Sequence, residues 1–316
     1  MKALVTGADG FVGTWLVRRL VADGWEVVGG VQPRPGAERV GGMAHGVRWV
    51  PLELTDAGSV RRCVDQAFDA VVHLAAVASG SDAAGDPGRA WEVNAAGTAR
   101  LVEALVSTKR RSGADPVFLV SSTAEVYGQG DGSAVPRRET DPAAPCSSYA
   151  ASKLGAEVAA LEGWRRAGVR TVIARAFPHT GPGQDTRFVV PAFTERLRLA
   201  KRTGAPAIKV GNLEPVREFL HVADVVDAYA RLVAAGEPGE TYNVASGRGV
   251  SVGELLDRLA KLIGVCPVRE VDPALVRATD IPYLVGDAAK LRARTGWAPR
   301  RSLEETLKEV MDAQAD

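Results

Sequence analysis

The chain has 316 residues, of which 46% are hydrophobic and 24% charged, so it can bury a core of ordinary size. Its 39 Lys and Arg residues nearly balance its 38 Asp and Glu residues, and the net charge of +1 argues against a strongly basic surface for nucleic acid. Three scattered cysteines and four scattered histidines match neither a disulfide framework nor a zinc site, and the apolar runs are too short for a membrane helix, so no metal or membrane partner is expected.

Short apolar strands alternate with amphipathic helices through the first half of the chain. The pattern predicts strands at 3–6, 25–30, 47–52, 70–74, 117–121 and 169–174, and helices at 11–22, 60–68, 89–109 and 149–166. The strands are continuously apolar, which is typical of a parallel sheet covered by helices on both faces. We therefore expect an α/β fold with a doubly wound parallel sheet of the Rossmann type. Because the first strand begins directly at residue 3, no signal peptide is expected and the protein is predicted to be cytoplasmic.

The pattern loosens after residue 177, where Gly- and Pro-rich loops separate shorter elements. Strands are predicted at 208–210 and 241–244, and helices at 190–201, 222–235, 252–263 and 303–311. Residues 1–177 would form a dinucleotide-binding domain, to which 222–245 return. Residues 178–221 and 246–316 would form a smaller C-terminal α/β substrate domain over the carboxyl edge of the sheet.

A glycine-rich loop joins the first strand to the first helix. Its sequence, Thr6-Gly-Ala-Asp-Gly-Phe-Val-Gly13, has glycines at positions 7, 10 and 13. This spacing permits a tight turn, close approach of a pyrophosphate, and close packing of the helix on the strand. The N-terminus of the helix then offers N–H groups to the anion. The context of a strand before and a helix after the loop predicts a dinucleotide site.

The end of the second strand bears on the choice between NAD and NADP. Many NAD sites have an acidic residue there, which binds the ribose 2′-OH. Here the strand is followed by Gln32-Pro33-Arg34, without an acid. Arg34 could bind a 2′-phosphate, which favours NADP over NAD, or it could be an ordinary solvated loop residue.

Tyr149 and Lys153 are four residues apart at the start of a predicted helix, so their side chains share one face. A phenol is a poor base at neutral pH, but a nearby ammonium would stabilise its anion and lower its pKa. Such a pair can exchange a proton with a sugar oxygen while a nicotinamide exchanges the hydride. The alternative is a simple surface face of a helix.

A run of hydroxyl residues, Ser121-Ser122-Thr123, ends another strand at the same expected edge. Thr123 is the best candidate to bind the reacting oxygen. Glu125 follows it, either as an acid–base group or as a loop cap.

Together these motifs resemble the extended short-chain dehydrogenase/reductases that modify nucleotide sugars. The resemblance extends over nearly the whole chain, in segments 6–13, 73–76, 93–98, 121–128, 149–153, 181–184, 216–224, 242–247 and 295–300. Within that family, segments 208–214 and 275–282 look most like GDP-6-deoxy-4-keto-mannose reductases and their GDP-mannose 4,6-dehydratase relatives.

The resemblance implies a set of site residues. The cofactor would contact Gly7, Gly10, Phe11, Val12, Gly13, Arg34, Glu53, Leu54, Leu74, Ala75, Ala76, Asn94, Ser121, Tyr149, Lys153, Phe177 and His179. The substrate would contact Thr123, Pro178, Phe188, Val189, Lys209, Asn212, Arg217, Arg277 and Asp280. Arg217 and Arg277 would bind the diphosphate, although salt bridges to Glu218 or Asp280 are the alternative for both. The family also dimerises through the helices that contain Trp91 and Tyr149.

Three reactions at sugar C4 fit this resemblance: reduction of a 4-keto sugar, 4-epimerisation with retained cofactor, and 4,6-dehydration with Glu125 as base. Dehydratases usually have Gln-Asp where this chain has Phe11-Val12, which favours reduction or epimerisation. The family also usually has an Asn that touches the substrate where this chain has Pro178, so the substrate or its pose would differ. We expect reduction of a GDP-linked 4-keto-6-deoxy sugar.

Overall fold

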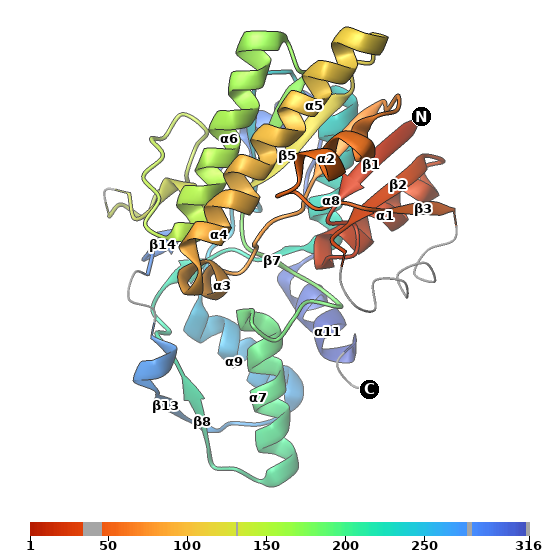
Figure 1. Cartoon of the computed structure of the whole chain (residues 1–316). Coiled ribbons are helices and arrows are strands. Elements are labelled where there is room, and N and C mark those ends of the chain that lie inside the picture. Colours follow the sequence, from red (N-terminus) through yellow and green to blue (C-terminus); the bar gives the residue numbers. More distant parts are fainter. Residues whose placement is uncertain (34–45, 131, 277–279, 314–316) are drawn as a thin grey trace.

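A seven-stranded parallel sheet forms the larger part of the molecule (Figure 1). The structure is a computed structural model, and it describes residues 1–33, 46–130, 132–276 and 280–313. The strand order is β11-β6-β5-β4-β1-β2-β3. These strands are β1 (Lys2–Thr6), β2 (Glu26–Val31), β3 (Val47–Pro51), β4 (Ala70–His73), β5 (Val117–Thr123), β6 (Thr171–Ala176) and β11 (Thr241–Val244). The doubly wound α/β fold predicted from the sequence is confirmed.

Helices cover both faces of the sheet, which explains why its strands are apolar throughout. In β1, Ala3 and Val5 belong to one buried cluster and Leu4 to the other, because successive side chains point to opposite faces. Helices α1 (Phe11–Ala22) and α8 (Val222–Ala235) pack in the first cluster. Helices α2 (Ala57–Val64) and α5 (Gly97–Ser112) pack in the second, to which α6 (Ser148–Ala167) contributes Ala160.

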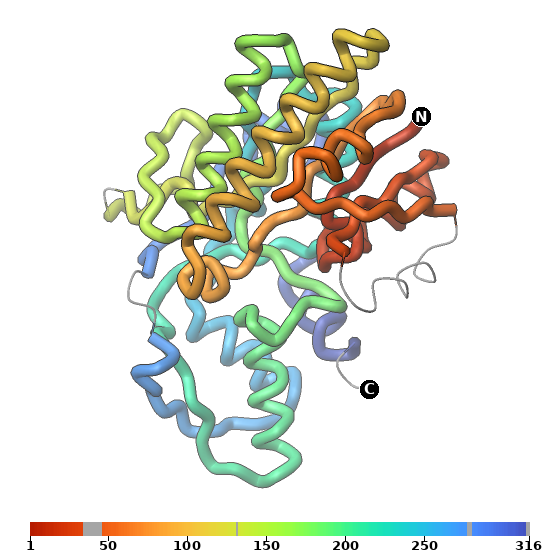
Figure 2. The backbone as a smooth tube through the Cα atoms, in the orientation of Figure 1, coloured from red at the N-terminus to blue at the C-terminus, as the bar shows by residue number. Residues whose placement is uncertain are grey.

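The smaller domain lies beneath the sheet domain in the view of Figures 1 and 2. Its core joins α7 (Val189–Thr203), α9 (Val252–Ile263) and α11 (Leu303–Ala313) to β8 (Ala207–Val210). Strand β13 (Val268–Val271) pairs in parallel with β8. The short strands β7 (His179–Thr180) and β10 (Leu220–His221) pair with each other. Strand β9 (Val216–Arg217) pairs with both β12 (Val250–Ser251) and β14 (Tyr283–Leu284).

Several details differ from the sequence-based expectation. The helix expected over 89–109 is divided into α4 (Pro87–Trp91), a π-helical turn (Glu92–Ala96) and α5. The short helices α3 (Gly80–Gly85) and α10 (Ala289–Thr295) were not predicted, because so few residues leave little periodicity. Trp297, in the part of the chain expected to form the substrate domain, is buried in a core cluster of the sheet domain and donates a hydrogen bond to the carbonyl of Asp224 (3.0 Å).

Among the helices that the structure describes, none is long and apolar enough to cross a membrane.

Candidate active site

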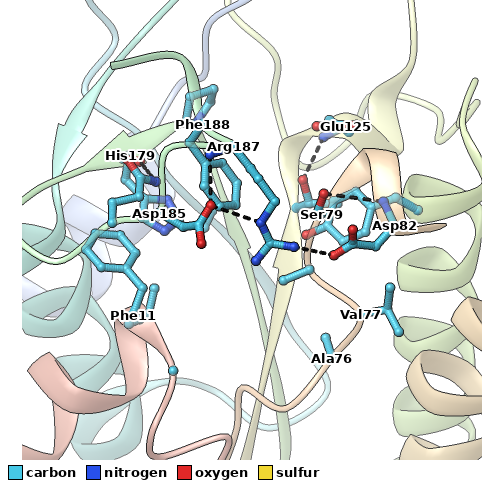
Figure 3. A pocket seen from close by; sticks show the side chains of 18 of the residues that line it. Phe11, Ala76, Val77, Ser79, Asp82, Glu125, His179, Asp185, Arg187 and Phe188 are labelled. Carbon is cyan, nitrogen blue, oxygen red and sulfur yellow. Dashed lines mark hydrogen bonds and ion pairs between the residues drawn. The ribbon is translucent and has the colours of Figure 1, made fainter. Parts of the chain in front are cut away.

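A cavity of about 1090 Å³ lies at the carboxyl edge of the sheet, with walls from both domains. Ligand pockets usually measure about 300–1,000 Å³, so this cavity is slightly larger than the usual range. Most of the residues expected to contact cofactor or substrate line it, from Gly7 after β1 to Asp280 before β14. Figure 3 shows part of this lining at close range.

The glycine loop packs so tightly that side chains have no room there. A Cβ atom on Gly13 would lie 2.1 Å from the carbonyl oxygen of Gly7, and one on Gly7 would lie 2.8 Å from the backbone of Ala75. Gly7 also has a φ of 66°, in the left-handed region. Gly10 precedes α1 without a side-chain cap, so the N–H groups of the first turn face the cavity. This bare, positively polarised helix end fits the pyrophosphate of a dinucleotide.

A buried hydrogen-bond chain fixes the strand ends beneath this loop. The Thr6 hydroxyl accepts bonds from the N–H groups of Leu74 and Ala75 (both 3.1 Å) and lies 2.8 Å from Nδ1 of His73. Nε2 of His73 lies 3.0 Å from the Thr98 hydroxyl, which itself donates to the carbonyl of Asn94 (2.6 Å). These roles assign a neutral His73 with its proton on Nε2. Burial, together with the charge of Lys153, lowers the pKa of His73 to about 3.

Asn94 does not line the cavity, although the sequence predicted a cofactor contact. It lies in the π-helical turn, where its side chain accepts from the Val77 N–H (2.8 Å) and donates to the Val77 carbonyl (3.2 Å). It also donates to the hydroxyl of Ser152 on α6 (2.9 Å). Asn94 therefore fixes the cavity-lining loop after β4 from behind.

Tyr149, Lys153, Thr123 and Glu125 all line the cavity, and Thr123 and Glu125 are close enough to Tyr149 to affect its pKa. Helix α6 begins at Ser148, because the Ser147 side chain accepts a bond from the Ala150 N–H (3.1 Å). Burial lowers the pKa of Lys153 to about 8, while the carboxylate of Glu157 opposes the shift.

The expected lowering of the Tyr149 pKa by Lys153 is not observed. Burial raises this pKa, the negative charge of Glu125 raises it further, and a hydrogen bond with Thr123 only partly compensates. The low-dielectric surroundings and the nearby carboxylate disfavour the phenolate more than a neighbouring cation favours it. In this structure the phenol of Tyr149 is therefore protonated at neutral pH.

Glu53 and Leu54 were also expected to contact the cofactor. Both line the cavity together with Gln32, which the sequence did not single out. Glu53 accepts hydrogen bonds from Gln32 (3.0 Å) and from the Thr55 hydroxyl (2.8 Å). Arg34 lies outside the described residues.

Phe177, Pro178 and His179 line the cavity where β6 ends. His179 donates from Nδ1 to the Phe177 carbonyl (2.9 Å), and burial lowers its pKa. Its ring lies parallel to that of Phe11, with an angle of 8° between the planes and 6.2 Å between the centroids (Figure 3). Ser121 is also in the lining and shares a hydrogen bond with the Tyr229 hydroxyl (2.9 Å).

On the substrate side, Phe188, Val189 and Asn212 line the cavity, and Arg217 forms an ion pair with Asp280 (2.8 Å). Lys209 does not belong to the lining. It points to the outer face of β8, since its neighbours Ile208 and Val210 point into the core, and it pairs with Asp272 (3.1 Å). Arg277 lies outside the described residues.

The structure also reveals an ion pair that the sequence did not predict. Arg187, in the loop before α7, reaches across the cavity to Asp82 on α3 (2.5 Å) and also pairs with Asp185 (2.9 Å) (Figure 3). Arg187 and Asp82 are 105 positions apart, so no local pattern could have linked them.

Comparison with known proteins identifies the family of the chain. The GDP-mannose 4,6 dehydratase family matches residues 4–310. The chain belongs to this family. It is 33% identical to GDP-6-deoxy-D-mannose reductase of Pseudomonas aeruginosa, over 98% of this chain and 96% of the relative. The resemblance expected from the motifs is thus confirmed, and the chain is an NAD(P)-dependent enzyme of the nucleotide-sugar-modifying, extended short-chain dehydrogenase/reductase type.

Two solved structures have the same fold over the whole chain. RMD from P. aeruginosa, complexed with NADPH, is 31% identical with a TM-score of 0.83, and the match covers 99% of this chain and 98% of that one. UDP-glucose 4-epimerase from Thermus thermophilus, complexed with NAD, is 32% identical with a TM-score of 0.85, at the same coverage. Both nicotinamide cofactors thus occur among the structural relatives.

Proposed function

We propose that this enzyme reduces the 4-keto group of a GDP-linked 4-keto-6-deoxy sugar. The observation that carries the proposal is the meeting of Tyr149, Lys153 and Thr123 with the glycine loop in one cavity. The similarity to GDP-6-deoxy-D-mannose reductase supports the same reaction. A protonated phenol, as reduction requires, is consistent with the raised pKa of Tyr149, which results from burial and from the charge of Glu125.

Each residue of this group has a distinct proposed role. When bound, a nicotinamide cofactor supplies the hydride for the sugar carbon. Tyr149 donates its phenolic proton to the sugar oxygen, and Thr123 binds the same oxygen and orients it. Lys153 provides a positive charge that stabilises the phenolate left after proton transfer. The charge of Glu125 favours the protonated phenol before the transfer.

The substrate diphosphate is proposed to bind Arg217. This guanidinium lines the cavity and can pair with phosphate oxygens in a bidentate manner. Its present partner is the Asp280 carboxylate, at 2.8 Å, so the diphosphate would compete for the same donors. Phe188 and Val189 would line the nucleotide pocket, and Asn212 would lie near the base or the sugar.

NADP is the proposed cofactor. The end of β2 and its continuation through residue 33 carry no acidic residue, and the position next to the strand is the neutral Gln32. A carboxylate at the end of β2 would repel a 2′-phosphate, whereas the amide of Gln32 carries no charge and itself donates a hydrogen bond to the neighbouring Glu53 carboxylate (3.0 Å).

4-Epimerisation is the second candidate function. The T. thermophilus epimerase is as similar to this chain as the reductase structure is. In addition, Pro178 lacks the side-chain donor that the family usually has at this position, which would leave a bound sugar fewer fixed contacts.

The enzyme is further proposed to be a homodimer. An apolar groove runs between α4–α5 and α6, lined by Trp91, Ala95, Ala99, Leu154 and Val158. Trp91 is 47% exposed and Val158 60% exposed, which is unusual for large apolar side chains on adjacent helices. A second copy of the same helices would cover both.

Incubation of the purified enzyme with 4-keto sugars linked to GDP, UDP, ADP or dTDP tests the function, with and without NADPH. Mass spectrometry should detect gain of a hydride and a proton only in the GDP-linked sugar and only with NADPH. Conversion of a 4-hydroxy nucleotide sugar into its C4 epimer without added cofactor, by protein that retains bound NAD, would instead support epimerisation; because the epimers have equal mass, NMR distinguishes them.

A further inference from the structure

A buried carboxylate, Glu157, lies directly beneath the proposed catalytic pair. It is one helical turn beyond Lys153 on α6, so Tyr149, Lys153 and Glu157 follow one another on one face of the helix. Glu157 is only 2% exposed, and charged side chains are rarely buried to this extent unless they are paired.

The partners of Glu157 come from two neighbouring strands. Arg175 on β6 forms a bidentate ion pair with it, from Nε to Oε1 (2.9 Å) and from Nη2 to Oε2 (2.7 Å). Ser122 on β5 donates to Oε1 (2.5 Å). Arg175 is itself 8% exposed, and its guanidinium lies 4.8 Å from the ring centroid of Tyr127. Glu157 therefore joins three elements that each carry proposed site residues: Thr123 on β5, Lys153 on α6, and Phe177 after β6.

Among the residues that the structure describes, few other charges surround Lys153. His73 on β4 faces it but is neutral, because the Thr6–His73–Thr98 chain uses both ring nitrogens. Glu125, in the turn after β5, acts on Tyr149, and so does Tyr229 of α8, which remains protonated. The carboxylate that acts on Lys153 is Glu157.

We propose that Glu157 is a positioning residue for the Tyr149–Lys153 pair: its carboxylate, paired with Arg175, keeps the buried Lys153 ammonium charged and ties β5 to α6 through Ser122. This rests on the proposed function only in the use that it assigns to Lys153. A neutral Lys153 could not stabilise the phenolate formed when Tyr149 gives up its proton. The charge of Glu157 would thus set the upper pH limit of activity without any contact with substrate.

Direct titration of Lys153 tests the electrostatic part of the proposal without any substrate. In protein labelled with ¹³C at the lysine Cε atoms, the Lys153 resonance is assigned by its loss in Lys153→Met. The wild-type resonance should titrate near pH 8, since burial lowers the pKa of Lys153 to about 8. In Glu157→Gln the midpoint should fall by about 1 unit or more, because an opposite charge is lost and the charge of Arg175 remains.

Two further variants separate charge from structure. Glu157→Gln combined with Arg175→Met removes both buried charges, so it leaves no unpaired guanidinium if the single variant fails to fold. Its Lys153 midpoint should lie between those of the wild type and Glu157→Gln. Glu254→Gln is the matched control, because it breaks an exposed ion pair on α9 in which Glu254 and Arg258 are one helical turn apart. It should leave the Lys153 titration midpoint unchanged.

The pH profile of kcat should follow the titration. Its alkaline limb should move to lower pH in Glu157→Gln by the same shift as the Lys153 resonance. An unchanged Lys153 midpoint in folded Glu157→Gln would overturn the proposal. A shifted midpoint in a protein that reduces no nucleotide sugar would support the pairing and refute the proposed function instead.

Discussion

His73 should make the protein less stable in mild acid. The ring is 3% exposed, and its two nitrogens are engaged by Thr6 and Thr98 in a chain that requires Nδ1 to accept a hydrogen bond. A proton on Nδ1 would break this chain and place a second charge beside Lys153. Burial therefore lowers the pKa of His73 to about 3, with Lys153 adding to the shift. His73→Asn removes the titrating group and keeps polar atoms of similar reach.

The size of the effect follows from linkage. An unfolded histidine has a pKa of about 6.5, so below this pH His73 binds a proton in the unfolded chain but stays neutral in the folded chain. Stability is then lost as the pH falls from about 6.5 towards 3. Below pH 6.5, His73 lowers the free energy of unfolding by about 1.4 kcal/mol for each pH unit. Between pH 7.5 and pH 5.0 the total loss due to His73 is about 2 kcal/mol.

Urea unfolding at several pH values between 5.0 and 7.5 measures this contribution as a difference between two proteins. Glu218 also affects how the free energy of unfolding of each protein changes with pH. Burial raises the pKa of Glu218 to about 7, although hydrogen bonds from Ser246 and Gly286 lower it in part. A raised carboxyl pKa gives a slope of opposite sign in this range, but it does so in both proteins. The wild type should lose about 2 kcal/mol more than His73→Asn. Parallel pH curves for the two proteins would mean that His73 is charged in the folded state, contrary to the assigned hydrogen bonds.

Three other substitutions test the cofactor loop, the acid and the groove. Gly13→Ala should weaken NADPH binding about 100-fold, or by about 2.7 kcal/mol, because the added Cβ would lie 2.1 Å from the Gly7 oxygen. A fluorescence titration measures this affinity, and an unchanged value would exclude the loop from the site. Tyr149→Phe should lower kcat about 10²–10⁴-fold while NADPH affinity is retained, and full turnover would exclude Tyr149 as the acid. Trp91→Asp should convert a dimer into a monomer in sedimentation velocity, whereas a wild-type monomer would refute the proposed interface.

The fold could be predicted because its signals are local. A parallel sheet covered on both faces needs apolar residues along its strands, as in residues 70–72 of β4, and the glycine loop needs a strand before it and a helix after it. The carboxyl ends of parallel strands share one edge, so Thr123 and Tyr149 could be expected to meet. The two-residue strands β7 and β10 left no such pattern, since their pairing depends on tertiary contacts.

The site was predicted less completely, for physical reasons that differ from residue to residue. Lys209 is a cation in a matching segment, but the alternation of β8 directs it outwards. The pKa of Tyr149 depends on burial, which spacing does not report. The sequence shows Glu157 only as a glutamate on a helix, because its pairing with Arg175 of β6 depends on the tertiary structure.

The polar contacts around the cavity differ in strength between its floor and its entrance. At the floor, the bonds of His73, Asn94 and Glu157 join buried groups, and leaving such a group unpaired costs about 1–3 kcal/mol. At the entrance, the Arg187–Asp82 pair has side chains 53% and 50% exposed, and exposed pairs contribute only about 0–1 kcal/mol. The buried groups behind Tyr149 and Lys153 are therefore fixed, while the Arg187–Asp82 pair at the entrance can break at little cost. Separation of Arg187 from Asp82 would therefore widen the entrance of the cavity and leave the buried contacts behind Tyr149 and Lys153 in place.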